Sequence, residues 1–244
     1  MKKIYVVGLG PGAGKQMTAE AYTALEQSEV IVGYPVYLDL IRDTFPDKIY
    51  KSTPMKQEVE RCHMAFMEAM QEKTTAMVCS GDAGVYGMAG LMLQISSKFP
   101  EVEVEIIPGI TAAIGGAAVL GAPLMHDFAV ISLSDLMTPW DKIEIRLRAA
   151  AMADFVICLY NPSSKKRSDY LEKACKIMKE FKKPETICGL VRNIGRKEET
   201  RQILTLEELE HTETDMFTTV FIGNAQTMCL NHKMVTPRGY NVTR

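Results

Sequence analysis

Short runs of apolar and β-branched residues alternate with longer helical patterns along the whole chain, and this alternation is the feature that most constrains the fold. Strands are expected over residues 4–7, 30–32, 76–79, 102–106, 129–132, 155–159, 186–190, 201–204 and 218–222. Helices are expected over residues 18–27, 36–41, 58–71, 88–97, 111–119, 140–152, 166–179 and 206–210. Parallel strands need crossover helices, so the pattern predicts an α/β protein with mainly parallel sheets.

The best domain boundary lies at the turn-rich segment 121–126, which contains Gly121 and Pro123. The sequence therefore predicts two α/β lobes, residues 1–120 and residues 121–244, with an inter-lobe cleft. A cleft between lobes is a preferred place for a small ligand.

The composition and charge of the chain limit the kinds of partner and environment that it suits. The 244 residues are 47% hydrophobic, and the net charge of -2 argues against binding of nucleic acid by bulk electrostatics. The longest uncharged stretch, residues 106–125, contains two prolines, four glycines and five alanines, which is poor membrane-spanning material. No secretory signal precedes the first strand, so a cytoplasmic protein is expected. The six cysteines form no C-x-x-C pair, which favours buried reduced thiols over metal ligands.

The glycine-rich loop 8–12 follows the first predicted strand and imitates two known phosphate-binding motifs. A P-loop would have glycine and serine or threonine where this chain has Leu9 and Gln16. A dinucleotide fingerprint is formally met by Gly8, Gly10 and Ala13. However, Pro11 interrupts that fingerprint, and the second strand lacks the acidic residue that binds ribose. A tight turn after a strand explains this loop alone equally well.

Five further loops follow predicted strands, and most of them carry polar groups. Asp82, in loop 80–87, can accept hydrogen bonds from ribose hydroxyls or act as a helix cap. Small residues in loop 108–113 permit close packing, and loop 132–140 carries several hydrogen-bonding side chains. The segments 160–167 and 189–199 together hold six cations, which suit a substrate with several carboxylates or a solvated surface.

Catalytic constellations are scarce in this sequence. The four histidines are scattered without metal-ligand spacing, and no G-x-S-x-G or H-E-x-x-H motif occurs. Methyl transfer from a sulfonium is compatible with this absence, because the cofactor carries the chemistry and the protein supplies orientation.

Taken together and in order, the loops resemble the tetrapyrrole (corrin/porphyrin) methylase family. The matching segments are 7–12, 81–82 with 86–87, 108–112 and 219–224, which span nearly the whole chain. Segments 132–140, 160–162, 189–193 and 234–240 are similar to the precorrin-3B (cobalt-factor III) C(17)-methyltransferase branch. That branch couples methylation to ring contraction in cobalamin biosynthesis. The resemblance implies a homodimer with S-adenosyl-L-methionine as cofactor, S-adenosyl-L-homocysteine as product, and a tetrapyrrole substrate that can carry cobalt.

The resemblance also implies site residues. The cofactor-binding residues would be Pro11, Ser80, Gly81, Asp82, Val85, Tyr86, Thr111, Ala112, Tyr160, Asn161, Gly189 and Leu190. Tyr160 and Asn161 stand where relatives often have a tyrosine-methionine pair. Gly10, Gly12, Lys165, Lys166, Arg192 and Arg196 are expected to bind substrate, and Ser132, Ser134, Asp135 and Thr138 to serve the proton transfers of ring contraction. No resident metal is expected.

Three alternatives stay open at this point. One is another corrin-precursor methylase or a diphthine synthase-like methylase. From other classes, a nicotinamide-dependent oxidoreductase would use the match at Gly8, Gly10 and Ala13, and a non-catalytic nucleotide-binding subunit would bind cofactor without turnover.

Overall fold

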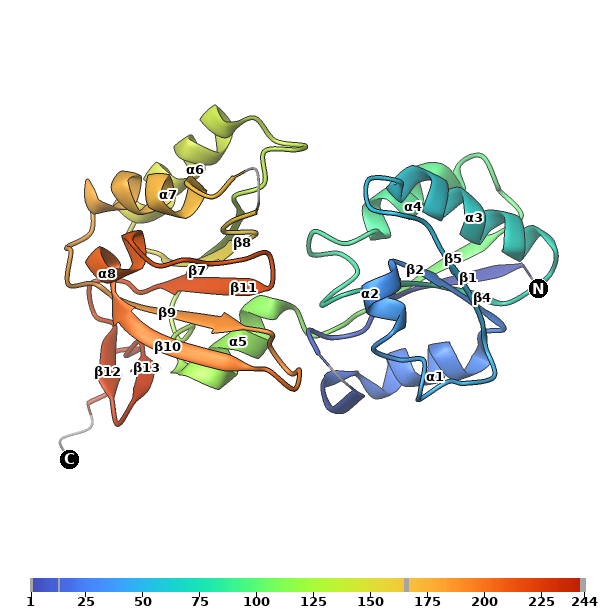
Figure 1. Cartoon of the computed structure of the whole chain (residues 1–244), viewed down its shortest axis with the longest axis horizontal. Helices are drawn as coiled ribbons and strands as arrows, with labels where there is room; N and C mark the ends of the chain where they lie inside the picture. The colour runs from blue at the N-terminus through green and yellow to red at the C-terminus, as the bar shows by residue number, and fades with distance from the viewer. Residues whose placement is uncertain (1, 13, 165–166, 242–244) are drawn as a thin grey trace. The chain divides into compact units, whose positions relative to one another are not determined.

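The computed structural model describes residues 2–12, 14–164 and 167–241 and divides the chain into two compact units, Met1–Ala112 and Ala113–Arg244 (Figure 1). The sequence placed this division later, between residues 120 and 121. The helix α5 (Ala112–Leu120) accounts for the difference, because it packs with the second unit. A Cβ added at Gly116 would lie 2.8 Å from the Phe221 ring.

The first unit contains a five-stranded parallel sheet in the order β3-β2-β4-β1-β5. Its strands are β1 (Lys3–Gly8), β2 (Val30–Gly33), β3 (Ile49–Ser52), β4 (Thr75–Cys79) and β5 (Glu103–Ile107). Its helices are α1 (Ala19–Gln27), α2 (Pro35–Leu38), α3 (Glu58–Met70) and α4 (Ala89–Ser96), and a short 3-10 turn spans Gly14–Gln16.

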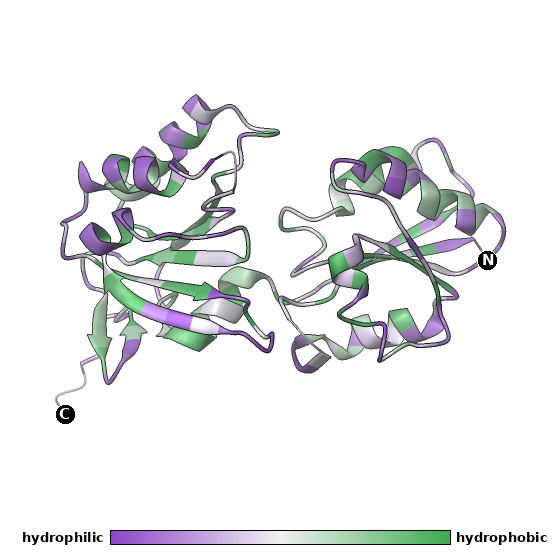
Figure 2. Cartoon of the chain, in the orientation of Figure 1, coloured by the Kyte–Doolittle hydropathy of each residue, from purple (hydrophilic) through white to green (hydrophobic). Residues whose placement is uncertain are grey.

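Both faces of this sheet are covered by helices. Buried residues of α3 and α4, such as Phe66 and Met92, pack with Val6 on one face. On the other face, Leu25 of α1 and Leu38 of α2 pack against alternate strand residues. Because both faces are buried, β2, β4 and most of β1 read as continuous apolar runs, whereas β3 and β5 carry charged residues. Figure 2 shows hydrophobic segments beside hydrophilic ones in this sheet.

The second unit contains a mixed sheet in the order β10-β9-β11-β8-β7. Its strands are β7 (Phe128–Ser132), β8 (Val156–Tyr160), β9 (Ile187–Arg192), β10 (Thr200–Thr205) and β11 (Thr218–Ile222). Only β7 and β8 pair in parallel, and the other three pairs are antiparallel. The expectation of mainly parallel sheets therefore holds for the first unit and is wrong for the second, where β9 turns directly into β10 without a crossover helix.

Helices α6 (Trp140–Met152), α7 (Tyr170–Lys179) and α8 (Leu206–Glu210) bury their apolar residues against one face of this sheet, and α5 packs on the other. A small third sheet joins β6 (Gly121–Ala122), β12 (Met228–Leu230) and β13 (Lys233–Val235). In the described part of the chain, no helix is long and apolar enough to cross a membrane.

Candidate functional site

Three glycine-rich loops meet at the carboxyl edge of the first sheet. They follow β4, β1 and β5, which are neighbouring strands, so parallel pairing places their ends side by side. Gly10 and Gly81 exchange two backbone hydrogen bonds, of 3.0 and 2.8 Å between nitrogen and oxygen. Both glycines have positive φ, of 77° and 69°, which other residues rarely adopt.

The third loop touches the other two through backbone atoms. A Cβ added at Gly109 would lie 2.2 Å from the Gly81 carbonyl oxygen and 2.6 Å from the Gly8 carbonyl carbon. Real Cβ atoms do not approach backbone so closely. Gly8 and Gly109 are therefore required by the mutual contact of the loops, whatever else the loops bind.

Asp82 organises this edge. Its Oδ1 accepts hydrogen bonds from the backbone N–H groups of Gly84 (2.7 Å) and Val85 (3.0 Å), and its Oδ2 accepts one from Gly109 (2.9 Å). The carboxylate thus fixes its own loop and links it to the loop after β5. These backbone contacts resemble the capping role predicted as the alternative for Asp82 more closely than they resemble a carboxylate available to ribose hydroxyls.

The structure brings together the cofactor-binding residues expected in the first unit. Pro11, Ser80, Gly81, Asp82, Val85, Tyr86 and Thr111 lie on these three loops, as do Gly10 and Gly12 from the predicted substrate set, and Ala112 follows Thr111 as the first residue of α5. Tyr86 has a φ of 54° and is 59% exposed, so its ring is presented at the loop surface. Thr111 lies beside Gly81, where an added Cβ would be 3.7 Å from the Thr111 Cα atom.

In the second unit, the carboxyl ends of β7 and β8 form a polar cluster. Ser132 pairs in register with Tyr160. The Ser132 Oγ accepts hydrogen bonds from the Asn161 side-chain amide (3.0 Å) and from the Ser134 backbone N–H (3.2 Å). Asn161 reaches this position with a φ of 52°. The strand ends therefore unite two predicted catalytic serines with one predicted cofactor residue.

Asp135 extends the cluster to α7. Its Oδ2 accepts a hydrogen bond from the Tyr170 hydroxyl (2.7 Å), and its Oδ1 lies 3.4 Å from the Arg167 guanidinium. The Tyr170 bond first, and the nearby Arg167 charge after it, hold the pKa of the Asp135 carboxyl below its usual range. The same bond raises the pKa of Tyr170. Asp135 therefore ties loop 132–140 to Tyr170 and Arg167.

Sequence reasoning missed both partners of Asp135. Arg167 also donates to the Ser134 Oγ (2.6 Å), although the sequence placed it only in a basic run. Tyr170 had been assigned to the interior of a helix beginning at residue 166, whereas α7 begins at Tyr170 itself. Thr138 lies in the same loop, yet the described residues offer it no hydrogen bond.

Other predicted cofactor residues of this unit serve its packing. The Tyr160 hydroxyl accepts a hydrogen bond from the Ala113 backbone N–H (2.6 Å) and so ties β8 to the start of α5. Gly189 faces α5, where an added Cβ would lie 2.7 Å from Leu120. Leu190 packs on the opposite face with the core of α6, α7 and α8. Both residues thus lie within β9, where Leu120 fills the space beside Gly189 and Leu190 is half-buried.

The predicted substrate cations are differently placed. Arg192, the last residue of β9, pairs with Asp215 through Nε and Oδ2 at 2.7 Å, and Arg196 lies over the Phe217 ring at 5.3 Å. Both guanidinium groups therefore already contact side chains of the segment that leads into β11. Lys165 and Lys166 lie outside the described residues, as does Ala13 of the dinucleotide match.

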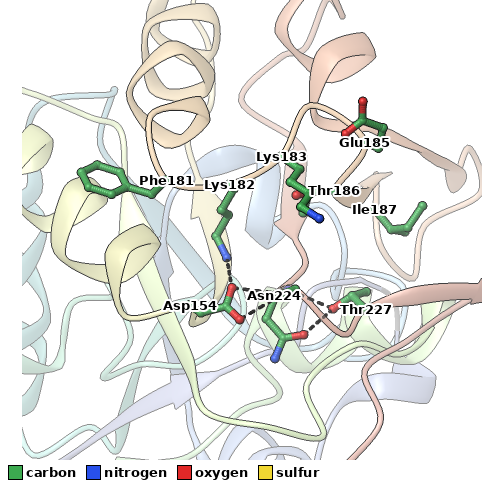
Figure 3. Close-up of a pocket in the computed structure, with 10 residues that line it drawn as sticks. Asp154, Phe181, Lys182, Lys183, Glu185, Thr186, Ile187, Asn224 and Thr227 are labelled. Atoms are coloured by element: carbon green, nitrogen blue, oxygen red, sulfur yellow. Dashed lines mark hydrogen bonds and ion pairs between the residues drawn. The ribbon is translucent and has the colours of Figure 1, made fainter.

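A pocket of about 240 Å³ lies at the opposite edge of the second sheet (Figure 3). Asp154 and Lys182 form a 2.9 Å ion pair in its wall, and Lys182 also donates to the Gly223 carbonyl (3.0 Å). Asn224 accepts from Thr227, which completes the turn after β11. None of the predicted site residues lines this pocket, and its buried cation already has an anionic partner.

The five buried thiols are poorly suited to metal binding or nucleophilic catalysis, because burial disfavours the thiolate. Cys62, Cys79, Cys158, Cys175 and Cys188 are buried and Cys229 is exposed. Burial raises the pKa of Cys62, Cys158 and Cys175 to about 12 and that of Cys79 to about 11. Within the described ranges, His, Cys, Asp and Glu form no group able to hold a metal ion.

The chain thus has two α/β units, with glycine loops meeting at the carboxyl edge of the first sheet and a serine-rich cluster at the end of β7 and β8 in the second. The chain belongs to the tetrapyrrole (corrin/porphyrin) methylases, whose family model matches residues 3–210.

Specific relatives refine this class. The chain is 46% identical over 238 residues to the probable cobalt-factor III C(17)-methyltransferase of Salmonella typhimurium, covering 97% of this chain and 99% of that protein. It is 42% identical to the cobalt-factor III methyltransferase of Priestia megaterium, with 98% of this chain covering 45% of that longer protein. The crystal structure of the methyltransferase CobJ superimposes with a TM-score of 0.88 at 34% identity, covering 96% of this chain and 99% of that one.

Proposed function

We propose that this chain transfers the methyl group of S-adenosyl-L-methionine to carbon 17 of cobalt-factor III or precorrin-3B, coupled to ring contraction, in cobalamin biosynthesis. The observation that carries the proposal is the 46% identity to a probable C(17)-methyltransferase over nearly the full length of both chains. Whether the substrate already carries cobalt is part of the proposal to be tested.

The first unit fits the cofactor. Its three loops expose backbone groups, the hydroxyls of Ser80 and Thr111 and the ring of Tyr86 at one edge, which are groups that a nucleoside with a ribose can use. The cofactor would supply an activated methyl on a sulfonium. The residues of this chain would orient that methyl in line with the ring carbon, which is the main contribution such an enzyme makes.

The second unit would supply polar groups toward the contracting ring. We keep Ser132 and Ser134 as the candidates for proton transfer, with Asn161 and Arg167 holding their hydroxyl groups. Asp135 is reassigned from proton transfer to positioning, because Tyr170 and Arg167 occupy both of its oxygens.

The deciding experiment incubates the protein with cobalt-factor III and methyl-labelled S-adenosyl-L-methionine and locates the label by NMR. We expect label at carbon 17 of a ring-contracted product. Label at another ring carbon would assign the chain to a different corrin-precursor methylase, and label on a protein substrate alone would indicate the diphthine synthase-like alternative. Cofactor binding without turnover would indicate a non-catalytic subunit.

The nicotinamide alternative conflicts with the sheet order. A dinucleotide-binding unit places the glycine-loop strand directly beside the second strand, with a helix starting at the loop. Here β4 separates β1 from β2, and α1 begins only at Ala19. Calorimetry should therefore show binding of S-adenosyl-L-homocysteine and none of NAD. Tight NAD binding without S-adenosyl-L-homocysteine binding is the result that refutes the methylase proposal.

We also propose that the protein is a homodimer in the cytoplasm, as expected from the family resemblance. Light scattering during gel filtration measures the mass directly, and a mass near the 27.2 kDa of one chain would contradict the dimer.

A further inference from the structure

Arg61 of α3 reaches the carboxyl edge of the first sheet. Its Nη2 donates hydrogen bonds to the backbone carbonyls of Thr53 (3.2 Å) and Pro54 (3.0 Å), which follow β3. Its guanidinium carbon lies 5.7 Å from the centre of the Tyr34 ring, which follows β2. The positive charge of Arg61 also opposes the burial-driven rise in the pKa of Cys79, the last residue of β4. Arg61 thus lies at the same edge as the glycine loops.

This guanidinium is buried without an anion. Arg61 is only 5% exposed, its Nε has no hydrogen-bond partner, and no carboxylate within the described ranges pairs with it. The other buried charged side chains in the described chain all have ionic partners: Glu68 has Lys51 and Lys73, Lys182 has Asp154, and Glu210 has Lys179. A buried charge is costly unless it is paired, so Arg61 lacks the partner that its position requires.

The sequence predicted other basic residues, among them Arg192 and Arg196, as the partners of the substrate carboxylates. Arg192 already pairs with Asp215, and Arg196 lies over Phe217. Arg61 stands alone within an amphipathic helix pattern, and only the fold shows that it points to the sheet edge with its charge unpaired.

We propose that Arg61 binds a peripheral carboxylate of the tetrapyrrole substrate and so determines specificity for a carboxylate-bearing ring. The proposal rests on the proposed function. A carboxylate would provide the missing counter-ion and accept hydrogen bonds from the remaining guanidinium donors. Tyr34 would flank the pair, since an aromatic face stabilises a guanidinium beside it.

The test measures binding of cobalt-factor III by absorbance titration to enzyme saturated with S-adenosyl-L-homocysteine, which prevents turnover. Arg61→Gln should weaken cobalt-factor III binding roughly 10- to 100-fold, the loss expected for one charge-assisted contact. Affinity for S-adenosyl-L-homocysteine, measured by calorimetry, should stay within about twofold, because losing one substrate contact does not alter a separate ligand's contacts. Wild-type binding of cobalt-factor III by Arg61→Gln would overturn the proposal.

A second ligand separates recognition from a structural role. When the peripheral carboxyl groups of the tetrapyrrole are amidated, wild-type enzyme should bind it more weakly, and Arg61→Gln should lose little further affinity. Equal extra losses with both ligands would mean that Arg61 only ties residues 53–54 to α3, which overturns the proposal.

Two more variants complete the design. Arg61→Lys keeps the positive charge but lacks the planar, bidentate donors of the guanidinium. This variant provides the test of the proposal if Arg61→Gln fails to fold. It should bind cobalt-factor III several-fold more weakly, and unchanged binding overturns the proposal.

Arg42→Gln is the matched control, because Arg42 also lies over a tyrosine, Tyr50, but has Asp39 at 3.7 Å. Its binding should be unchanged.

The two proposals can fail separately. Wild-type enzyme that binds cobalt-factor III in an Arg61-dependent manner but methylates another position refutes the C(17) assignment alone. Wild-type enzyme that does not bind cobalt-factor III refutes both.

Discussion

At the scale of single residues, the contact between Gly109, Gly81 and Gly8 makes a sharp prediction. Gly109→Ala would place a methyl group 2.2 Å from a backbone oxygen that cannot move away, so the first unit should lose at least about 3 kcal/mol of unfolding free energy. Urea unfolding followed by circular dichroism measures this loss.

Gly90 is the matched control for that substitution. It lies in α4, and nothing lies within 4 Å of an added Cβ. Gly90→Ala should leave stability unchanged or raise it by about 0.5–1 kcal/mol, because alanine has less backbone entropy to lose in a helix. Similar losses for both variants would show that the loops are not in the described contact.

Asp82 carries a second prediction at this scale. Asp82→Ala removes the acceptor of three backbone N–H groups and should cost about 1–3 kcal/mol of stability. Cofactor affinity should fall as well, because the loop loses its geometry. Asp82→Asn retains one carbonyl oxygen and should show a smaller loss in both measurements. A variant Asp82→Ala with normal stability but weakened calorimetric binding of S-adenosyl-L-homocysteine would instead favour direct contact with ribose.

At the scale of elements, the bond between Asp135 and Tyr170 couples loop 132–140 to α7. The pKa of Asp135 is lowered in the fold, so its stabilising contribution is present above about pH 3.9 and is lost as pH falls through the lowered value. The pKa of Tyr170 is raised, so that contribution is complete below about pH 10 and is lost as pH rises through the raised value. The loop is therefore held across the neutral range.

Tyr170→Phe tests this coupling. Without the hydroxyl donor, the pKa of Asp135 should rise toward its ordinary value, and NMR titration of the carboxyl carbon measures it. The pKa of Glu68, which Lys51 and Lys73 hold below its usual range in the other unit, serves as the control and should not change. An unchanged pKa for Asp135 would show that Arg167 alone maintains the carboxylate.

Elements with strong apolar runs could be predicted from the sequence, and weaker ones could not. The buried strands β1, β2 and β4 lie where their β-branched residues indicated. The strand β3 was missed because its residues IYKS are largely exposed or half-buried and carry no continuous apolar run. The strands β12 and β13 were missed because each has only three residues, most of which face solvent.

At the scale of the whole molecule, the sequence predicted two α/β units but not the strand directions in the second. No helix is expected between the strands 186–190 and 201–204, and this gap is the sequence signal of the antiparallel pair β9–β10 that the prediction of parallel sheets overlooked. The helix expected at 206–210 made the connection from β10 to β11 look like a parallel crossover. The glycine loops were predictable as a set because each follows a strand. Arg167 and Tyr170 were not predictable, because their partners Ser134 and Asp135 lie on a loop distant in the chain. Arg61 was not predictable, because its burial without an anion follows from tertiary packing.

The buried thiols offer a way to follow each unit separately. Cys62 and Cys79 belong to the core between α3, α4 and the first sheet, whereas Cys175 and Cys188 belong to the core of the second unit. Their raised pKa values and burial suppress alkylation until the surrounding structure opens. Iodoacetamide labelling with mass spectrometry should modify exposed Cys229 at once and the buried thiols only as urea increases. Cys62 and Cys79 should become reactive at the same urea concentration, and different midpoints for these two would show that their core does not open cooperatively. The native thiols thus report the local opening of each unit without any engineered cysteine.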